Sequence, residues 1–316
     1  MDSELIKLAK EHAKNGGFTA KPSVSVFDQP FEKQTGFDQL TALAERTGNP
    51  NYATGRAFSP SSLKKVHHHP LKYIEYVKEK QKTEEERLEE FYNSRTRHFA
   101  IGQVFEDMLR HGIEKTADEL YVPESGTLTP AVKKAAHASG RKAVRIDDWN
   151  KCLQMFTTVT EVVPEYVERL RVSSFEAPAY DTVKVGPNEI QVGGYLDSYY
   201  APDKYASDIK TIEKMSDAEK RIFERNWGTF QYWLQPAIYD IRFNFKKFEF
   251  MFVSKDDNPS VMLISFGRDQ LDQLREYLLS TALSEVAFYL DNGFQTQTSQ
   301  FWGKMPRIEP EVRLFV

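Results

Sequence analysis

The strongest constraint on this chain is a pair of acidic residues, Asp197 and Asp208, with Lys210 two positions after the second. The two aspartates belong to strand-like runs on either side of residues 201–204, whose Ala-Pro-Asp-Lys composition is typical of a turn. Because side chains alternate between the faces of a strand, we expect Asp208 and Lys210 on one face and Ile209 in the core. Two carboxylates and an ammonium group on adjacent strands indicate a site for Mg²⁺ and a phosphodiester.

Length and composition narrow the class of protein. The chain has 316 residues, 40% of them hydrophobic, which is enough to bury a full core. No apolar run approaches the roughly 18 residues that a membrane span needs, and the N-terminal residues lack the pattern of a signal peptide. The single cysteine, Cys152, can form neither an internal disulfide nor a multi-cysteine zinc or iron–sulphur site. We therefore expect a cytoplasmic protein with no membrane partner.

A basic segment is the feature that most suggests contact with nucleic acid. The net charge of −4 argues against binding through bulk charge, so a local cluster would have to make the contact. The segment contains no acidic residue and five basic ones: Lys133, Lys134, Arg141, Lys142 and Arg145. It could neutralise several backbone phosphates, or it could be an ordinary solvated helix and turn.

The hydrophobic pattern predicts helices and strands in an order typical of an α/β protein. Residues 1–58 are predicted as an N-terminal arm of uncertain structure, and the charge-rich residues 73–96 as an exposed or partner-facing helix. Helical periodicity marks residues 99–112, 147–170 and 269–292, the last ended by Gly293. Strand patterns mark a hairpin at residues 182–192 and runs at 243–252 and 260–266. This order favours a mixed sheet flanked by helices.

Three other residues bear on the chemistry. Glu106 lies beside the apolar stripe of the predicted 99–112 helix, so its carboxylate could face a metal or could be an ordinary surface glutamate. Gln235 and Tyr239 are four residues apart and would share one face of a helix. Pro236 between them fits a helix if Gln235 lies in the first turn. This pair could serve the site or could belong to a capped amphipathic helix.

Several motifs, taken in order, resemble the PD-(D/E)XK nuclease superfamily: Gly102-x-x-x-Glu106, Asp197, Asp208-Ile209-Lys210-Thr211 and Gln235-x-x-x-Tyr239. Within it the chain resembles the RecB-like branch that includes the RecE-type phage exonucleases, over residues 59–292. Members of this branch often carry a histidine where this chain has Glu106, and some hold an iron–sulphur cluster for which this chain lacks the cysteines. The resemblance implies a restriction-endonuclease-like mixed central sheet flanked by helices, in a nuclease domain at residues 59–316.

The resemblance also implies a function. A Mg²⁺-dependent DNA exonuclease, able to use Mn²⁺, would degrade double-stranded DNA from free ends in the 5′→3′ direction and supply single strand for recombination. Glu106, Asp197, Asp208 and the Ile209 carbonyl would hold the metal, and Lys210 would act on the attacking water and the phosphate. Gln235 and Tyr239 would position the DNA or Lys210. A homo-oligomer, a single-strand annealing partner and the host cytoplasm (for a phage-encoded protein) are further expectations, with residues 73–96 as one contact.

Two other functions remain open at this point. A structure- or site-specific endonuclease could use the same metal site, and it would cut a circular duplex readily. A non-catalytic DNA-binding protein could keep the fold, but the intact set of Asp197, Asp208 and Lys210 argues against it.

Overall fold

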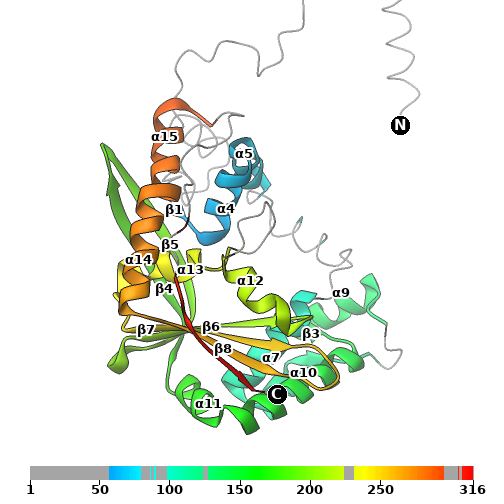
Figure 1. Cartoon of the computed structure of the whole chain (residues 1–316). Helices are drawn as coiled ribbons and strands as arrows, with labels where there is room; N and C mark the ends of the chain where they lie inside the picture. Colours follow the sequence, from blue (N-terminus) through cyan, green and yellow to red (C-terminus); the bar gives the residue numbers. More distant parts are fainter. Residues whose placement is uncertain are drawn as a thin grey trace, which may run out of the picture.

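The computed structural model in Figure 1 describes residues 57–79, 86, 89, 98–123, 127–223, 231–294, 305 and 308–315. This part of the chain is a mixed β-sheet with helices on both faces. The predicted α/β class, with a mixed central sheet flanked by helices, is therefore confirmed. The predicted N-terminal arm lies outside the described residues except for its last two, which form strand β1 and pair with the sheet.

The central sheet has seven strands among the described residues, in the order β1-β5-β6-β7-β8-β9, with β4 also paired to β5. The strands are β1 (Ala57–Phe58), β4 (Ser174–Val185), β5 (Asn188–Tyr200), β6 (Tyr205–Ile212), β7 (Lys247–Ser254), β8 (Val261–Gly267) and β9 (Glu311–Phe315). The pairs β1–β5 and β6–β7 are parallel, and the other pairs are antiparallel. A separate two-stranded sheet joins β2 (Leu120–Tyr121) to β3 (Lys142–Ala143).

Two hydrophobic cores lie on opposite faces of the sheet, and the side chains of β7 alternate between them. Phe248, Phe250 and Phe252 face the first core, whereas Met251 and Val253 face the second. The first core is covered by α4 (Pro60–His68), α5 (Pro70–Glu79), α12 (Ala218–Phe223), α13 (Leu234–Phe243), α14 (Arg268–Leu278) and α15 (Ser284–Asn292). The second is covered by α7 (His98–His111), α10 (Ile146–Val162) and α11 (Pro164–Arg171). The shorter α8 (Ile113–Asp118) and α9 (Pro130–Ala138) follow α7 along the chain.

The sheet opens between β5 and β6. These strands pair over three residue pairs, from Tyr200 with Tyr205 to Ser198 with Ser207. In that register Asp197 would next stand opposite Asp208, and the pairing stops there, while β6 stays paired with β7 as far as Ile212. The two aspartates therefore lie at the point where the two strands separate.

Most predicted elements are present, including the hairpin, the 99–112 helix, the 260–266 strand and Gly293 at the end of α15. The single helix predicted at 147–170 is wrong, because Pro164 cannot donate a backbone hydrogen bond and starts a second helix. The strand predicted at 243–252 begins only at Lys247. Residues 73–79, predicted as exposed, instead bury Tyr73 in the first core, and residues 80–96 lie outside the described part except for 86 and 89.

No helix within the described residues is both long enough and apolar enough to cross a membrane.

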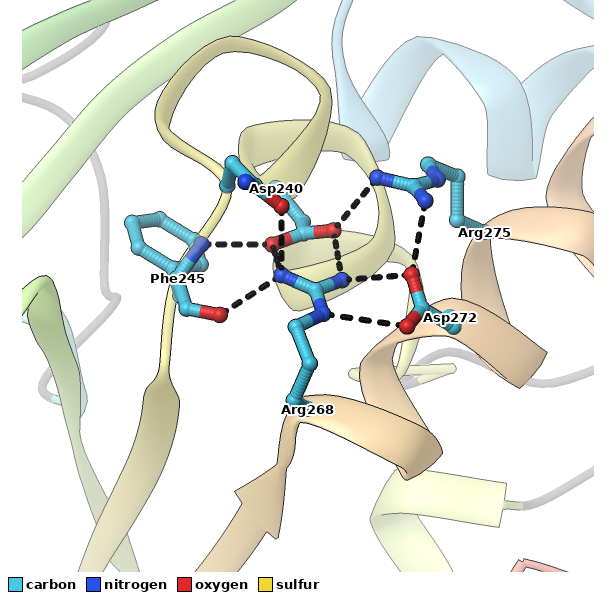
Figure 2. A network of polar contacts seen from close by, with 6 residues as sticks. Asp240, Phe245, Arg268, Asp272 and Arg275 are labelled. Carbon is cyan, nitrogen blue, oxygen red and sulfur yellow. Dashed lines mark hydrogen bonds and ion pairs between the residues drawn. The ribbon is translucent and has the colours of Figure 1, made fainter.

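A network of charged groups joins the end of α13 to the start of α14 (Figure 2). Asp240 is 0% exposed and accepts hydrogen bonds from Arg268 at 2.5 and 2.8 Å and from the backbone N–H of Phe245 at 2.8 Å. Arg275 reaches the same carboxylate at 3.3 Å, and Asp272 accepts from both arginines at the surface. The buried carboxylate thus fixes the position of α13, the helix that carries Gln235 and Tyr239.

We predict that Asp240→Asn lowers the free energy of unfolding by roughly 3 kcal/mol, because it removes a buried charge that several donors share. The matched change Asp272→Asn, whose side chain is 42% exposed, should cost under about 1 kcal/mol because solvent screens that ion pair. Urea unfolding followed by circular dichroism measures both. Equal losses in the two variants would contradict this ranking.

Candidate active site

Asp208 and Lys210 share one face of β6, as the strand alternation predicts. Lys210 Nζ forms an ion pair with Asp208 Oδ2, and Asp208 is only 2% exposed. Ile209 points into the second core. Its backbone N–H donates to Asp197 Oδ2 at 3.3 Å, which ties the first carboxylate to β6 beyond the last strand pair. The two carboxylates and the ammonium group therefore meet at the opening of the sheet.

Burial and neighbouring charges shift the pKa values of Asp197, Asp208 and Lys210. Burial, followed by the negative charge of Asp197, holds the pKa of Asp208 well above its usual value. Burial also acts to raise the pKa of Asp197, but Lys210 and the hydrogen bond from Ile209 outweigh it and the pKa is lowered. Burial disfavours the charged form of Lys210, yet the two carboxylates raise its pKa above the usual range. The carboxylates repel each other in a buried site, and a divalent cation between them would relieve that repulsion.

Helix α13 places an amide and a phenol beside this group. Gln235 is the second residue of the helix, so Pro236 lies in the first turn, where a helix tolerates proline. The Gln235 Nε2 amide donates to Asp208 Oδ1 at 3.4 Å. Tyr239 is buried, and its hydroxyl lies 3.0 Å from the position that a Cβ atom on Gly194 would occupy. The absence of a side chain at Gly194 therefore lets Tyr239 approach β5 next to the carboxylates.

Glu106 reaches the site from the other face of the sheet. Its helix α7 packs closely on β6 at Gly102, where an added Cβ would lie 3.5 Å from Thr211 Oγ1. The carboxylate forms an ion pair with Arg110 one turn later. Burial, followed by the charge of Asp197, raises the pKa of Glu106 to about 7, although Arg110 acts in the opposite direction. Glu106 thus lies within electrostatic range of Asp197 but is turned towards Arg110.

Arg110 is a site residue that the sequence did not single out. Its guanidinium donates to Glu106, to the backbone oxygen of Asp197 at 3.4 Å and to Glu176 Oε1 at 3.4 Å. It also lies 4.7 Å from the centre of the Phe175 ring. A helical Arg four residues after Glu106 was visible as an ordinary i,i+4 pair, but its contacts with β4 and β5 depend on the fold.

The β4–β5 hairpin is distorted at the level of Asp197. Glu176 would stand opposite Asp197, but the β4–β5 pairing skips this position. Its φ is 50°, a left-handed conformation that is uncommon for a residue with a side chain. The neighbours on either side pack into different cores, Ala177 into the first and Phe175 into the second. Such a backbone costs about 1–3 kcal/mol, and here it directs Glu176 towards Arg110 beside the site.

The donor set fits a hard divalent cation, although the side chains do not form a closed cage. Asp197 and Asp208 offer the carboxylate oxygens that Mg²⁺ prefers, and Mg²⁺ keeps several waters as further ligands. Among the described residues, no group of three or more His, Cys, Asp or Glu side chains converges for metal binding, since Glu106 is directed at Arg110. Ligation by Glu106 and by the Ile209 carbonyl stays a prediction.

A second lysine, also not predicted, stands near Lys210. Lys64 lies on α4, a helix that begins after the N-cap Ser59. Its Nζ is 5.2 Å from the centre of the Tyr232 ring. Burial, followed by the positive charge of Lys210, lowers the pKa of Lys64 to about 8. Nothing local in the sequence places this helix over β6.

The basic segment is less open than its composition suggested. Lys133 is only 8% exposed on α9, and Lys142 and Arg145 form ion pairs with Asp107 at 2.7 Å and Asp147 at 3.7 Å. Lys134 and Arg141 are exposed. Contact of all five basic residues with DNA stays a prediction, and these two are the best placed for it.

A hollow on the described surface lies elsewhere, at the start of α14. It has a volume of about 690 Å³ and is lined by Gly267, Arg268, Asp269, Gln270, Gln273 and Glu309. Arg268 is already committed to Asp240, and the other charged lining residues are acidic. We therefore place the chemistry at the carboxylates.

Comparison with known proteins adds little. No protein-family model and no curated protein matches this chain. A solved structure from Eubacterium rectale, named "Putative exonuclease", shares 12% identity over 78% of this chain and 85% of its own, with a TM-score of 0.46. The structure of SSO0001 shares 11% identity over 75% and 82%, with a TM-score of 0.31. Both TM-scores are low, so neither likeness bears on function.

We predict that Glu106→Gln weakens Mn²⁺ binding by about tenfold or more, if its carboxylate turns to the metal. In the unaltered protein the affinity should rise with pH through about 7, because the proton on Glu106 competes with the metal. This rise should flatten in the variant. The control Asp107→Asn changes the adjacent carboxylate, which pairs with Lys142. Isothermal titration calorimetry measures both, and an unchanged affinity in Glu106→Gln would remove Glu106 from the ligand set.

For the basic segment, we predict that combined Lys134→Glu and Arg141→Glu substitutions reduce the salt dependence of DNA binding by about two units of slope, because each phosphate contact contributes about 0.9. Lys184→Glu, at an exposed position on β4, is the control. Fluorescence anisotropy at several salt concentrations gives the slopes. If both variants behave alike, the segment is an ordinary solvated surface.

Proposed function

We propose that this protein is a Mg²⁺-dependent deoxyribonuclease of the PD-(D/E)XK type that hydrolyses phosphodiester bonds at the ends of double-stranded DNA. The observation that carries the proposal is the meeting of Asp197 and Asp208 where β5 and β6 separate, with Lys210 on the same face. Two carboxylates and one lysine at an open point of a sheet match what metal-assisted phosphodiester hydrolysis requires.

The residues divide the work by their chemistry. A bound Mg²⁺ would neutralise charge on the phosphate and lower the pKa of a ligated water. Asp197 and Asp208 would hold it. Lys210 would donate to a phosphate oxygen and stabilise the charge that develops in the transition state.

Gln235 and Tyr239 are positioning residues in this scheme. The Gln235 amide contacts Asp208 Oδ1, so it limits rotation of the carboxylate that would ligate the metal. Tyr239 fills the space beside Gly194 and holds the middle of α13 against β5. Both would act through Asp208 and the strand geometry, without touching the bond that breaks.

The order of the motifs supports a finer proposal. We infer a 5′→3′ exonuclease that acts on free duplex ends, accepts Mn²⁺ in place of Mg²⁺ and leaves single strand for recombination. A homo-oligomer that encloses DNA and a single-strand annealing partner, in the cytoplasm of a phage host, belong to the same proposal. What supports it is the resemblance to the RecE-type exonucleases, which rests on four motifs in the same order: Glu106, Asp197, Asp208-Ile209-Lys210 and Gln235-x-x-x-Tyr239.

We predict that Asp208→Ala lowers Mg²⁺-dependent digestion of linear duplex by at least about 10³-fold, because it removes a metal ligand and the partner of Lys210. Asp203→Ala, at an exposed aspartate in the turn after β5, should digest at the normal rate. Release of 5′ and 3′ labels over time gives both rate and polarity. Unchanged digestion by Asp208→Ala would refute the site.

A circular plasmid separates the two nuclease classes. An exonuclease leaves a closed circle intact while it degrades the same DNA after linearisation. Rapid cutting of the closed circle would replace the exonuclease proposal by an endonuclease that uses the same residues.

A further inference from the structure

Lys64 and Lys210 approach one aromatic ring from different elements. Lys64 comes from α4 and Lys210 from β6, and their Nζ atoms lie 5.2 and 5.4 Å from the centre of the Tyr232 ring. Arg221 of α12 makes a side-chain hydrogen bond with the same tyrosine. Aromatic faces attract cations, so the ring can hold both ammonium groups close to Asp208.

The position of the Lys64 ammonium group costs free energy unless an anion lies beside it. Among the described residues no ion pair joins Lys64 to a carboxylate, and Asp208 is already paired with Lys210. A half-buried ammonium beside another ammonium is disfavoured by desolvation and by like-charge repulsion. The next residue on α4, Lys65, is exposed, whereas Lys64 is partly buried. An apolar side chain at residue 64 would pack on Tyr232 without these costs.

The charge balance of the site points to an anionic ligand. Asp197 and Asp208 are matched by Lys64 and Lys210, while Glu106 is matched by Arg110. A divalent cation on the two aspartates would therefore give the site an excess of positive charge. Such a site favours phosphate groups over neutral or cationic ligands.

We propose that Lys64 and Lys210, arranged around Tyr232, form a phosphate-binding site in which Lys210 contacts the phosphate being hydrolysed and Lys64 contacts a neighbouring phosphate of the same strand. This inference rests on the proposed nuclease function. Lys64 is then a substrate-binding residue that sets how the strand enters the site.

The test measures binding in Ca²⁺, which takes the same oxygen ligands as Mg²⁺, and a gel checks that the probe stays uncut. The probe is a short fluorescent duplex, and the variants of the full chain are Lys64→Met, Lys64→Arg and Lys65→Met. Methionine keeps an apolar stem against Tyr232, so Lys64→Met should stay folded, which a thermal melt checks. We expect Lys64→Met to weaken binding about tenfold and to lower the salt slope by about one, whereas Lys64→Arg keeps the slope. Lys65→Met should match the unaltered protein.

A second measurement locates the phosphate. Duplexes that carry a neutral methylphosphonate at successive positions from one end are bound by the unaltered protein and by Lys64→Met. One position should weaken binding of the unaltered protein but cost nothing further in Lys64→Met, because the contact is already lost. Lys65→Met should respond to every position as the unaltered protein does.

The outcomes separate the two proposals. If the unaltered protein binds DNA but Lys64→Met keeps its affinity and slope, or if Lys65→Met loses as much, the phosphate site is wrong and the nuclease proposal stands. Additive losses at every methylphosphonate position would also overturn it. If the unaltered protein binds no DNA and digests none, the function itself is wrong.

Discussion

The hydrogen bond from the Ile209 backbone to the Asp197 carboxylate is the interaction on which the candidate site depends. β5 and β6 have stopped pairing at this level, so this contact takes over from the sheet in holding the strands together. It brings the partly buried carboxylate of Asp197 beside the buried carboxylate of Asp208. The positive charge of Lys210 offsets part of the repulsion between them. A polar opening in the middle of a sheet is costly, and the metal site that we propose there would account for it.

The structure around the site is closely packed. The phenylalanine row of β7 lies next to β6, and the buried Asp240 holds α13, so Gln235 and Tyr239 start from a fixed helix. On the other face, α7 lies against β6 at Gly102, close to Thr211. Positive groups stand on both sides, with Arg110 beside Glu106 and Lys64 beside Lys210. The site is therefore built from charges supplied by both layers of helices.

Local rules predict the centre of this site but not its edges. Strand alternation alone places Asp208 and Lys210 on one face of a strand, and a spacing of four residues places Gln235 and Tyr239 on one face of a helix. Lys64, Arg110 and Tyr232 follow no such rule, because their partners are distant in sequence and meet them only through packing. For Lys133 a sequence rule gives the wrong result, because a run of charged residues predicts exposure and this lysine is buried. The two-residue strand β1 is too short to carry any period, whereas the break at Pro164 could have been predicted.

The most direct measurement of the central claim is a crystal structure of the protein soaked in Mn²⁺, with anomalous scattering used to find the ion. A peak bridging the carboxylates of Asp197 and Asp208, with oxygen ligands about 2.1 Å away and Lys210 released from Asp208, is the predicted result. Mn²⁺ bound elsewhere while the Asp208–Lys210 pair stays closed would contradict a metal-dependent site at the opening between β5 and β6.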